Sequence, residues 1–254
     1  MTLPDGLAAA LARFARLGTV LVASDYDGVA APIVADPAAA FPLPGTVAAL
    51  EALAGLPGTT AALVSGRDRA TLGRLSGAGD GVVTVGSHGA EWAEGFEGAL
   101  TADLRELRST VLAGLTAVAE RFPGAAVEPK PLGAALHVRN VVDPSAGPVA
   151  LEEARRGPAA LPGVHATDGK AVLELTVLDA SKGRALQTLR ERTGAAAVLY
   201  LGDDVTDEKA FAVLTGTEDV SIKVGDGATA ARFRVDGPAD ARAVFEELLA
   251  LRRG

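Results

Sequence analysis

Residues 20–29, with the sequence VLVASDYDGV, constrain the fold of this chain more than any other stretch. The small and β-branched apolar residues at its start predict a buried strand, which leads directly into Asp25, Asp27 and a turn at Gly28. In an open α/β sheet, ligands bind at the carboxyl ends of the strands. Two carboxylates in such a crevice repel one another, and a hard divalent cation such as Mg²⁺ is the simplest compensation.

The same residues have a simpler interpretation. Asp25 and Asp27 could cap the following helix and form an ordinary polar turn. A strand followed by Asp-x-Asp-Gly does not by itself distinguish a functional site from a turn. The choice therefore depends on which residues lie at the carboxyl ends of the other strands.

Composition excludes several classes of protein. The chain has 254 residues, 48% hydrophobic and 22% charged, as expected of a globular protein with a substantial core. Its net charge of −8 is spread without a basic block, which argues against nucleic-acid binding. The absence of cysteine excludes disulfides, thiolate zinc sites and cysteine nucleophiles.

We expect neither a membrane-spanning segment nor an export signal in this sequence. Its apolar runs are shorter than the roughly 18 residues that span a bilayer. The first residues lack the basic and then apolar pattern of a signal peptide, because Asp5 comes early. We therefore expect a cytoplasmic protein without a membrane partner.

Short apolar runs alternate with helical stretches in both terminal parts of the chain. Strands are predicted at residues 19–24, 59–64, 82–85, 196–201 and 220–224. Helices are predicted at residues 7–17, 46–54, 68–75, 181–193, 206–214 and 238–251. This alternation predicts an α/β fold with a mostly parallel sheet covered by helices on both faces.

The middle of the chain has a different pattern. A long amphipathic helix is predicted at residues 102–121, followed by strands at 125–128 and 134–139, a helix at 149–156 and a hairpin over 165–176. We expect an α+β domain at residues 103–177, inserted into a core of residues 1–102 and 178–254. Insertions over the ligand edge of a sheet commonly act as lids.

Two further polar motifs follow predicted strands or begin helices. Ser65, Gly66 and Arg67 follow the second strand and could hold an anionic oxygen at a helix start, although this motif taken alone favours Ser65 as an ordinary helix cap. Lys182 begins a helix, where the macrodipole disfavours a cation. A nearby phosphate or the Asp25 carboxylate would explain this lysine, and a solvated surface position is the alternative.

The strongest single signal is Gly202-Asp203-Asp204-Val205-Thr206-Asp207-Glu208, which follows an apolar strand. Helix capping explains one or two of these four acids. Coordination of Mg²⁺ by Asp203, with Asp207 in support, explains the group better. Asp204 and Glu208 remain open between orienting the ligands and capping the helix.

Together these motifs resemble those of the haloacid dehalogenase superfamily of phosphohydrolases. The four matching segments are Asp25-x-Asp27-Gly28-Val29, Ser65, Lys182, and Gly202-Asp203-Asp204 with Asp207. The resemblance implies a Rossmann-like haloacid dehalogenase core with a mostly parallel sheet. The insertion between the second and third motifs resembles the larger type of cap domain in that superfamily.

Further segments resemble the trehalose-6-phosphate phosphatase family. They are Gly86-Ser87-His88-Gly89-Ala90-Glu91, Glu128-Pro129-Lys130, Leu136-His137-Val138-Arg139, Gly169-Lys170-Ala171-Val172-Leu173-Glu174 and the motifs around Lys182 and Asp203. The match covers nearly the whole chain in order. One departure is Val29, where the family usually has threonine; we expect activity to survive, with backbone donors making that phosphate contact.

The resemblance implies a role for each catalytic residue. Asp25 is the nucleophile that forms an aspartyl-phosphate, and Asp27 is the general acid and base. Ser65 and Lys182 stabilise the phosphoryl oxygens. Mg²⁺ is the implied cofactor, with Asp25, Asp27, Asp203 and Asp207 as its predicted site.

The resemblance also implies residues that bind the substrate. In the inserted domain these are Glu128, Lys130, Arg139, Lys170 and Glu174, whose alternating charges suit a hydroxyl-rich sugar. In the core they are Gly66, Arg67 and His88. Taken without the resemblance, the charges in the inserted domain are better explained as cross-strand ion pairs on a solvated sheet.

The function implied is Mg²⁺-dependent hydrolysis of trehalose 6-phosphate in trehalose biosynthesis, with a possible functional link to a trehalose-phosphate synthase. One alternative is a phosphatase of another sugar phosphate, of the sucrose-phosphate or glycosyl-glycerate-phosphate type. A phosphomutase and a non-catalytic regulatory copy are further alternatives. The regulatory copy is disfavoured because the acids, Ser65 and Lys182 are all present.

Overall fold

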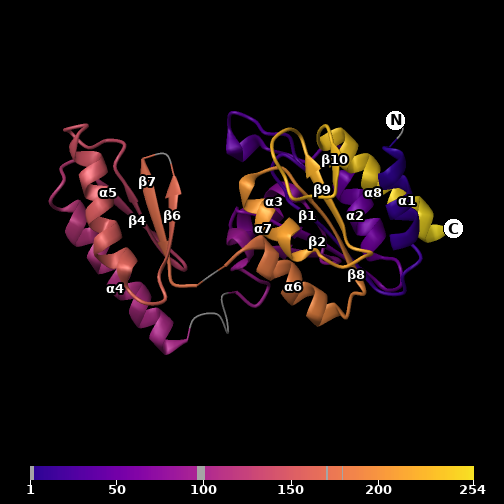
Figure 1. The fold of residues 1–254 in the computed structure, drawn as a ribbon, viewed down its shortest axis with the longest axis horizontal. Coiled ribbons are helices and arrows are strands. Elements are labelled where there is room, and N and C mark those ends of the chain that lie inside the picture. Colours follow the sequence, from indigo (N-terminus) through magenta and orange to yellow (C-terminus); the bar gives the residue numbers. More distant parts are fainter. Residues whose placement is uncertain (1–2, 96–100, 170, 179) are drawn as a thin grey trace. The chain divides into compact units, whose positions relative to one another are not determined.

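The computed structural model describes residues 3–95, 101–169, 171–178 and 180–254. The chain divides into two compact units, which we call the core unit (Met1–Ala93 with Ala180–Gly254) and the inserted unit (Glu94–Asp179). Each unit has its own sheet and its own helices (Figure 1).

The described part of the core unit contains a six-stranded sheet in the order β10-β9-β8-β1-β2-β3. Its strands are β1 (Val20–Ser24), β2 (Thr59–Val64), β3 (Val82–Val85), β8 (Ala197–Gly202), β9 (Val220–Val224) and β10 (Phe233–Val235). Every neighbouring pair is parallel, which confirms the predicted α/β architecture. The short edge strand β10 was not predicted, because three residues are too few to show an alternating pattern.

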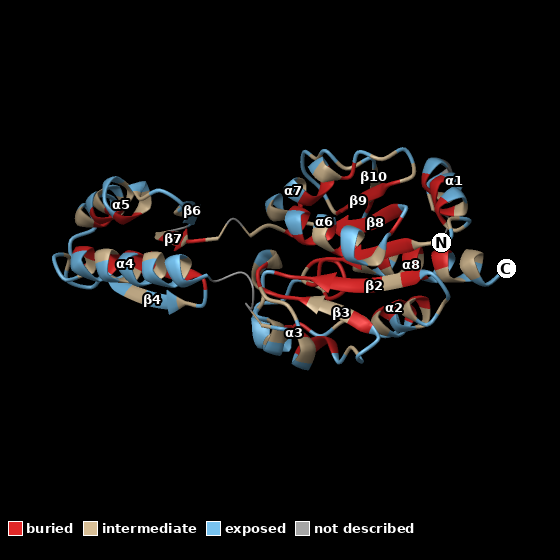
Figure 2. Cartoon of the chain, turned by 90° about the horizontal axis from the view of Figure 1, so that it is seen from below, coloured by how far each residue is buried: buried red, intermediate tan, exposed pale blue. Residues whose placement is uncertain are grey.

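Helices cover both faces of this sheet. One face packs against α1 (Asp5–Phe14), α2 (Thr46–Ala54) and α8 (Pro238–Arg253). The other packs against α6 (Lys182–Thr193) and α7 (Val205–Val213). The helix α3 (Arg69–Ser76) follows β2, and its Leu72 and Leu75 pack with the helices of the first face. Val20 and Val22 of β1 point into the first cluster, whereas Leu21 and Ala23 point into the second. This double burial explains the continuous apolar run in β1, and Figure 2 shows the buried strands between the helices.

The parallel register brings three polar segments to one edge of the sheet. Ser24 at the end of β1 lies beside Leu63 of β2 and Leu201 of β8. The segments that continue from these strands, beginning with Asp25, Ser65 and Asp203, therefore leave the sheet at neighbouring positions. This is the edge where ligands bind in open α/β sheets.

The inserted unit pairs an antiparallel sheet with two helices. The helices are α4 (Ala102–Ala119) and α5 (Ala146–Arg156), and the strands are β4 (Ala126–Lys130), β5 (Gly133–His137), β6 (His165–Gly169) and β7 (Val172–Thr176), in the order β4-β5-β7-β6. Leu136, Leu173 and Leu175 pack with Val111 and Leu115 of α4. The helices thus cover one face of this sheet (Figure 1).

Among the described residues, every helix is too short or too polar to cross a lipid bilayer.

Candidate active site

Asp25 follows β1 and is nearly buried. Its backbone N–H donates to the carbonyl oxygen of Leu201 (2.9 Å), which continues the pairing of β1 with β8. The N–H of Tyr26 donates to Asp25 Oδ1 at 2.7 Å and fixes the orientation of the carboxylate. Asp25 is therefore held at the sheet edge instead of capping a helix.

Lys182 supplies the charge opposite Asp25. Its Nζ lies 2.7 Å from Asp25 Oδ2 and 2.8 Å from Asp207 Oδ1, and its side chain is 3% exposed. The helix itself is capped by Ser181, whose Oγ accepts from the Arg184 N–H. The interpretation of Lys182 as a solvated lysine is therefore wrong: the lysine at this helix start is paired with two buried carboxylates.

Asp207 is the centre of a hydrogen-bond network. Besides Lys182, the hydroxyl of Tyr200 donates to its Oδ1 at 2.6 Å. Its Oδ2 accepts from the backbone N–H groups of Asp203 and Asp204, both at 3.0 Å. Four donors match the roughly four lone pairs that a carboxylate offers. Asp207 therefore orients Lys182 and the loop that carries Asp203.

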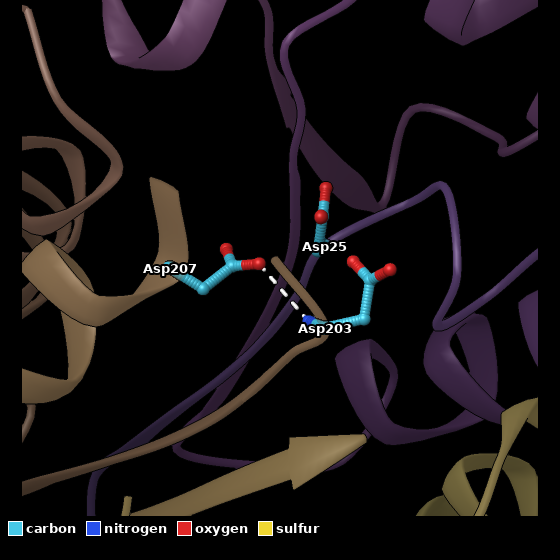
Figure 3. A group of neighbouring side chains, drawn as sticks. All are labelled: Asp25, Asp203 and Asp207. Atoms are coloured by element: carbon cyan, nitrogen blue, oxygen red, sulfur yellow. Dashed lines mark hydrogen bonds between the residues drawn. The ribbon is translucent and has the colours of Figure 1, made fainter. Parts of the chain in front are cut away.

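Asp203 completes a cluster of three carboxylates. Oxygen atoms of Asp25, Asp203 and Asp207 lie within 4.8 Å of one another. Figure 3 shows Asp25 facing Asp203, which directly follows β8, and Asp207, which lies in the first turn of α7. The turn after β1 permits this approach, because a Cβ at Gly28 would lie 1.9 Å from Asp203 Oδ2. Gly28 also has a φ of +75°, which disfavours other residues.

The electrostatics of this cluster favour a bound cation. Burial raises the pKa of Asp25 well above its usual value; Lys182 opposes the rise, and Asp207 adds to it. Burial and then Asp207 raise the pKa of Asp203. With three ionised acids and one ammonium the group has a formal charge of −2, which one divalent cation neutralises. These oxygen donors fit Mg²⁺.

Asp27 faces a different partner. Arg67 Nε and Nη2 donate to its two carboxylate oxygens, each at 2.7 Å. The Arg67 guanidinium also lies over the Tyr26 ring, 5.7 Å from its centroid. The hydrogen bond to Asp27 raises the pKa of Arg67 despite partial burial, so this arginine stays charged.

Ser65 lies in the same region and is buried. Its Oγ accepts from the Arg67 N–H at 3.1 Å, whereas α3 is capped by Asp68, which accepts from the Thr71 N–H. The interpretation of Ser65 as the cap of α3 is therefore wrong. Ser65 belongs to the loop that carries Arg67.

His88 packs against this loop. A Cβ at Gly66 would lie 2.5 Å from His88 Cε1, so the imidazole is in close contact with the Gly66 backbone. His88 has a φ of +55° and follows Ser87 with a φ of +51°, a conformation that costs non-glycine residues energy. The loop after β3 is thus strained where it contacts the loop after β2.

The predicted sugar-binding residues lie within the inserted unit. Lys130 Nζ lies 2.7 Å from Glu174 Oε2, and His137 Nε2 lies 2.8 Å from Glu128 Oε2. Register puts these side chains on the sheet face opposite the one covered by helices. Arg139 is exposed just after β5, and Lys170 lies outside the described residues. The ion pairs expected from the alternative interpretation are therefore present.

Two residues of the site were missed in the sequence. Tyr200 was included in an apolar strand, yet its hydroxyl binds Asp207. Lys223 is buried in β9, and its Nζ donates to the carbonyl oxygen of Asp203. A lysine within the apolar sequence VSIKV was a usable signal, because a buried charge requires a partner.

The two acids left open by the sequence lie outside the carboxylate cluster. Asp204 is exposed directly before α7, and its N–H donates to Asp207. Glu208 Oε2 accepts from the Ala230 N–H at 2.8 Å and holds the segment before β10. Both therefore have structural roles in this arrangement.

The parallel sheet with clustered acids at one edge, together with the inserted α+β unit, defines a fold of the haloacid dehalogenase type. The model of the trehalose-phosphatase family matches residues 23–239. The chain belongs to this family.

Individual relatives agree with this assignment. The chain is 38% identical to the trehalose-phosphate phosphatase of Mycobacterium avium, over 91% of this chain and 62% of the relative. It is 37% identical to that of Mycobacterium tuberculosis, over 85% of this chain and 57% of the relative. The structure of Aspergillus fumigatus trehalose-6-phosphate phosphatase superimposes with a TM-score of 0.77 at 27% identity, covering 96% of this chain and 97% of the other. The chain thus spans about three fifths of the length of the mycobacterial relatives.

Proposed function

We propose that this protein hydrolyses trehalose 6-phosphate to trehalose and inorganic phosphate. The observation that carries the proposal is the buried Asp25, paired with Lys182 and flanked by Asp203, in a chain of the trehalose-phosphatase family. Relatives that share this family bear the name trehalose-phosphate phosphatase. Its place would be in trehalose biosynthesis, in the cytoplasm, downstream of a synthase that makes the sugar phosphate.

Asp25 is the proposed nucleophile. Its carboxylate oxygen attacks phosphorus, an acyl-phosphate bond forms, and the bond between phosphorus and the sugar oxygen breaks. Asp27 donates a proton to the departing sugar oxygen. In the second half-reaction Asp27 accepts a proton from water, whose oxygen attacks phosphorus and releases inorganic phosphate from Asp25.

Asp25, Asp203 and the backbone carbonyl of Asp27 are the proposed Mg²⁺ ligands. The cation supplies charge neutralisation and orientation for an incoming phosphate dianion. Asp207 was also predicted as a ligand. Its carboxylate already accepts four hydrogen bonds, which favours a supporting role. Asp207 would hold Lys182 and the Asp203 loop in position.

Lys182 and Ser65 are proposed to stabilise the transferring phosphoryl group. A buried ammonium beside the nucleophile suits charge that shifts onto the phosphoryl oxygens. The Ser65 hydroxyl already accepts from the Arg67 N–H and keeps its own O–H free to donate. Gly66 and His88 are proposed to line this end of the substrate site.

Residues 103–177 are proposed to act as the substrate-recognition cap. Glu128, Lys130, Arg139, Lys170 and Glu174 are its proposed sugar-binding residues. The Lys130–Glu174 pair supports this role, because an ion pair on an open sheet face offers donors and acceptors to sugar hydroxyls.

The test is phosphate release from trehalose 6-phosphate, sucrose 6-phosphate and glucose 6-phosphate, with Mg²⁺ and with EDTA. We expect Mg²⁺-dependent selectivity for trehalose 6-phosphate, and loss of more than about 10³-fold in Asp25→Asn. Mg²⁺-dependent preference for another sugar phosphate would retain the chemistry and overturn the proposed substrate. No turnover of any of them would contradict the proposal as a whole.

A further inference from the structure

Both oxygens of the Asp27 carboxylate accept a hydrogen bond from one side chain, that of Arg67. Arg67 donates from Nε to Oδ2 and from Nη2 to Oδ1, each at 2.7 Å, which is the bidentate geometry of the strongest arginine–carboxylate pairs. The Arg67 side chain is 14% exposed and that of Asp27 is 32% exposed. The pair is therefore shielded enough to define a geometry, unlike a solvated surface ion pair.

Arg67 is itself held from several directions. Its backbone N–H donates to Ser65 Oγ, and its carbonyl oxygen accepts from the Ser87 N–H at 2.7 Å. Its guanidinium lies over the ring of Tyr26. Tyr26 is fully buried, and its hydroxyl donates to the Ala40 carbonyl oxygen at 2.7 Å. These contacts hold the guanidinium in place, and both of its donors to Asp27 are thereby fixed.

This arrangement limits what Arg67 can do for a substrate. The two N–H groups that form its fork are occupied by Asp27, so the same fork cannot also bind a phosphate. A carboxylate that acts as general acid and base must be held in a fixed orientation toward the atom that gains or loses the proton, because proton transfer depends on hydrogen-bond geometry. Arg67 can provide that direction while one Asp27 oxygen exchanges a proton and the other remains bound to it.

We propose that Arg67 is the positioning residue of Asp27 and acts on the reaction through that carboxylate instead of through contact with the substrate. The inference rests on the proposed function, in which Asp27 protonates the leaving oxygen and then activates water. It replaces the predicted substrate contact of Arg67 with a role inside the enzyme.

Substrates with different leaving groups test the proposal. A sugar alkoxide must be protonated as it leaves, whereas p-nitrophenolate leaves without a proton. In Arg67→Ala we expect the turnover of trehalose 6-phosphate to fall by about 10- to 100-fold, which is less than the roughly 10²- to 10⁴-fold attributed to a general acid and base, because Asp27 itself is retained. With p-nitrophenyl phosphate, the first turnover should stay within about 3-fold of wild type. The steady-state rate should then be lower than in wild type, because hydrolysis of the aspartyl-phosphate also needs Asp27 to activate water. Nitrophenol should therefore be released in a burst before the steady state.

A double-mutant cycle separates positioning from substrate contact. If Arg67 acts through Asp27, Asp27→Ala with Arg67→Ala should be no slower than Asp27→Ala alone, measured on the nitrophenol burst and on steady-state turnover. Arg67→Lys keeps the positive charge but loses the paired donors of the guanidinium, so its turnover of trehalose 6-phosphate should lie between those of wild type and Arg67→Ala. Arg74→Ala, an exposed arginine of α3, removes the same charge and should match wild type. Thermal melts establish that each variant is folded.

Two results would overturn the proposal. One is an equal loss from Arg67→Ala in the presence and absence of Asp27. The other is a raised KM with unchanged kcat for both classes of substrate, which is the signature of a substrate contact. The failure of the proposed substrate is separable: wild type would then hydrolyse the aryl phosphate and not trehalose 6-phosphate, and glucose 6-phosphate would serve as the alkyl substrate in the same cycle.

Discussion

Lys182 and Asp25 form an ion pair in the interior of the core unit, with 2.7 Å between Nζ and Oδ2 and side chains that are 3% and 6% exposed. Asp207 lies on the other side of the same ammonium. A cation shared by two buried carboxylates ties the sheet edge after β1 to the helix α7. The pair therefore links two segments of the candidate site.

Replacing the lysine should destabilise the protein. In Lys182→Met the two carboxylates lose a buried partner, which costs about 3–5 kcal/mol when one member of such a pair is removed. We expect that loss in urea unfolding without a divalent cation, and a smaller loss with Mg²⁺, which restores positive charge. Turnover should be abolished in both conditions. Equal stability of Lys182→Met and wild type without Mg²⁺ would contradict a buried charge pair.

The stabilisation by Mg²⁺ should depend on pH. Because burial raises the pKa of Asp25 and of Asp203, the folded protein without metal binds more protons than the unfolded chain. Its stability therefore falls as pH rises above the usual aspartate value of about 3.9 toward the raised values. Mg²⁺ needs the ionised carboxylates, so its effect should increase over the same window.

Thermal melts with and without MgCl₂, in buffers of about pH 5 and about pH 8, measure this linkage. The increase in Tm on adding MgCl₂ should be larger at the higher pH. Asp25→Asn removes one titrating ligand and should weaken the pH dependence. An identical Tm increase at both pH values would contradict the assignment of these acids to the cation.

Gly28 is expected to be irreplaceable for the approach of Asp203. In Gly28→Ala the new Cβ would lie 1.9 Å from Asp203 Oδ2, so the carboxylate must move and Mg²⁺ binding should be lost. Gly225→Ala is a matched control, because its φ of +76° carries the same backbone cost of about 1–2 kcal/mol while nothing lies within 4 Å of the new Cβ. Isothermal titration with MgCl₂ compares the two variants. Similar Mg²⁺ affinities would contradict the steric argument.

Glu174 should affect substrate choice more than chemistry. Glu174→Ala removes the partner of Lys130 in the inserted unit, far along the sequence from the carboxylate cluster. We expect kcat/KM for trehalose 6-phosphate to fall by about 10- to 100-fold, as for a lost charge-assisted hydrogen bond, with little change for p-nitrophenyl phosphate. Glu152→Ala, a helix ion-pair residue of α5, is the control. Equal losses on both substrates would argue against a sugar contact.

Much of the fold follows from local pattern. The strand β1 was predicted from an apolar run because each of its residues is buried between two helix layers, which forces a continuous apolar sequence. The strands of the inserted unit were predicted from a different pattern. An antiparallel sheet covered on one face alternates buried and more exposed residues, as β7 does. The three-residue strand β10 was missed because it is too short to have a period.

The positions of the polar residues directly after predicted strands were also sufficient to predict that Asp25, Ser65 and Asp203 lie at one edge of the sheet. Parallel strands share the direction of their carboxyl ends, so the residues directly after them must be neighbours. Partnerships between side chains are another matter. Asp27 with Arg67, Asp207 with Tyr200, and Lys223 with the Asp203 carbonyl join positions whose separation in sequence has no fixed relation to distance.

Strand order and helix packing create those contacts, and rotamers then select one partner among several. Lys182 shows the limit most clearly: its place at a helix start indicated that an anion was near, but the choice between a phosphate and Asp25 required coordinates. Sequence pattern therefore specified at which edge of the sheet the acidic and hydroxyl residues gather. Packing in three dimensions specified which oxygen faces which nitrogen, because hydrogen bonds depend on distances of a few tenths of an ångström that no residue pattern encodes.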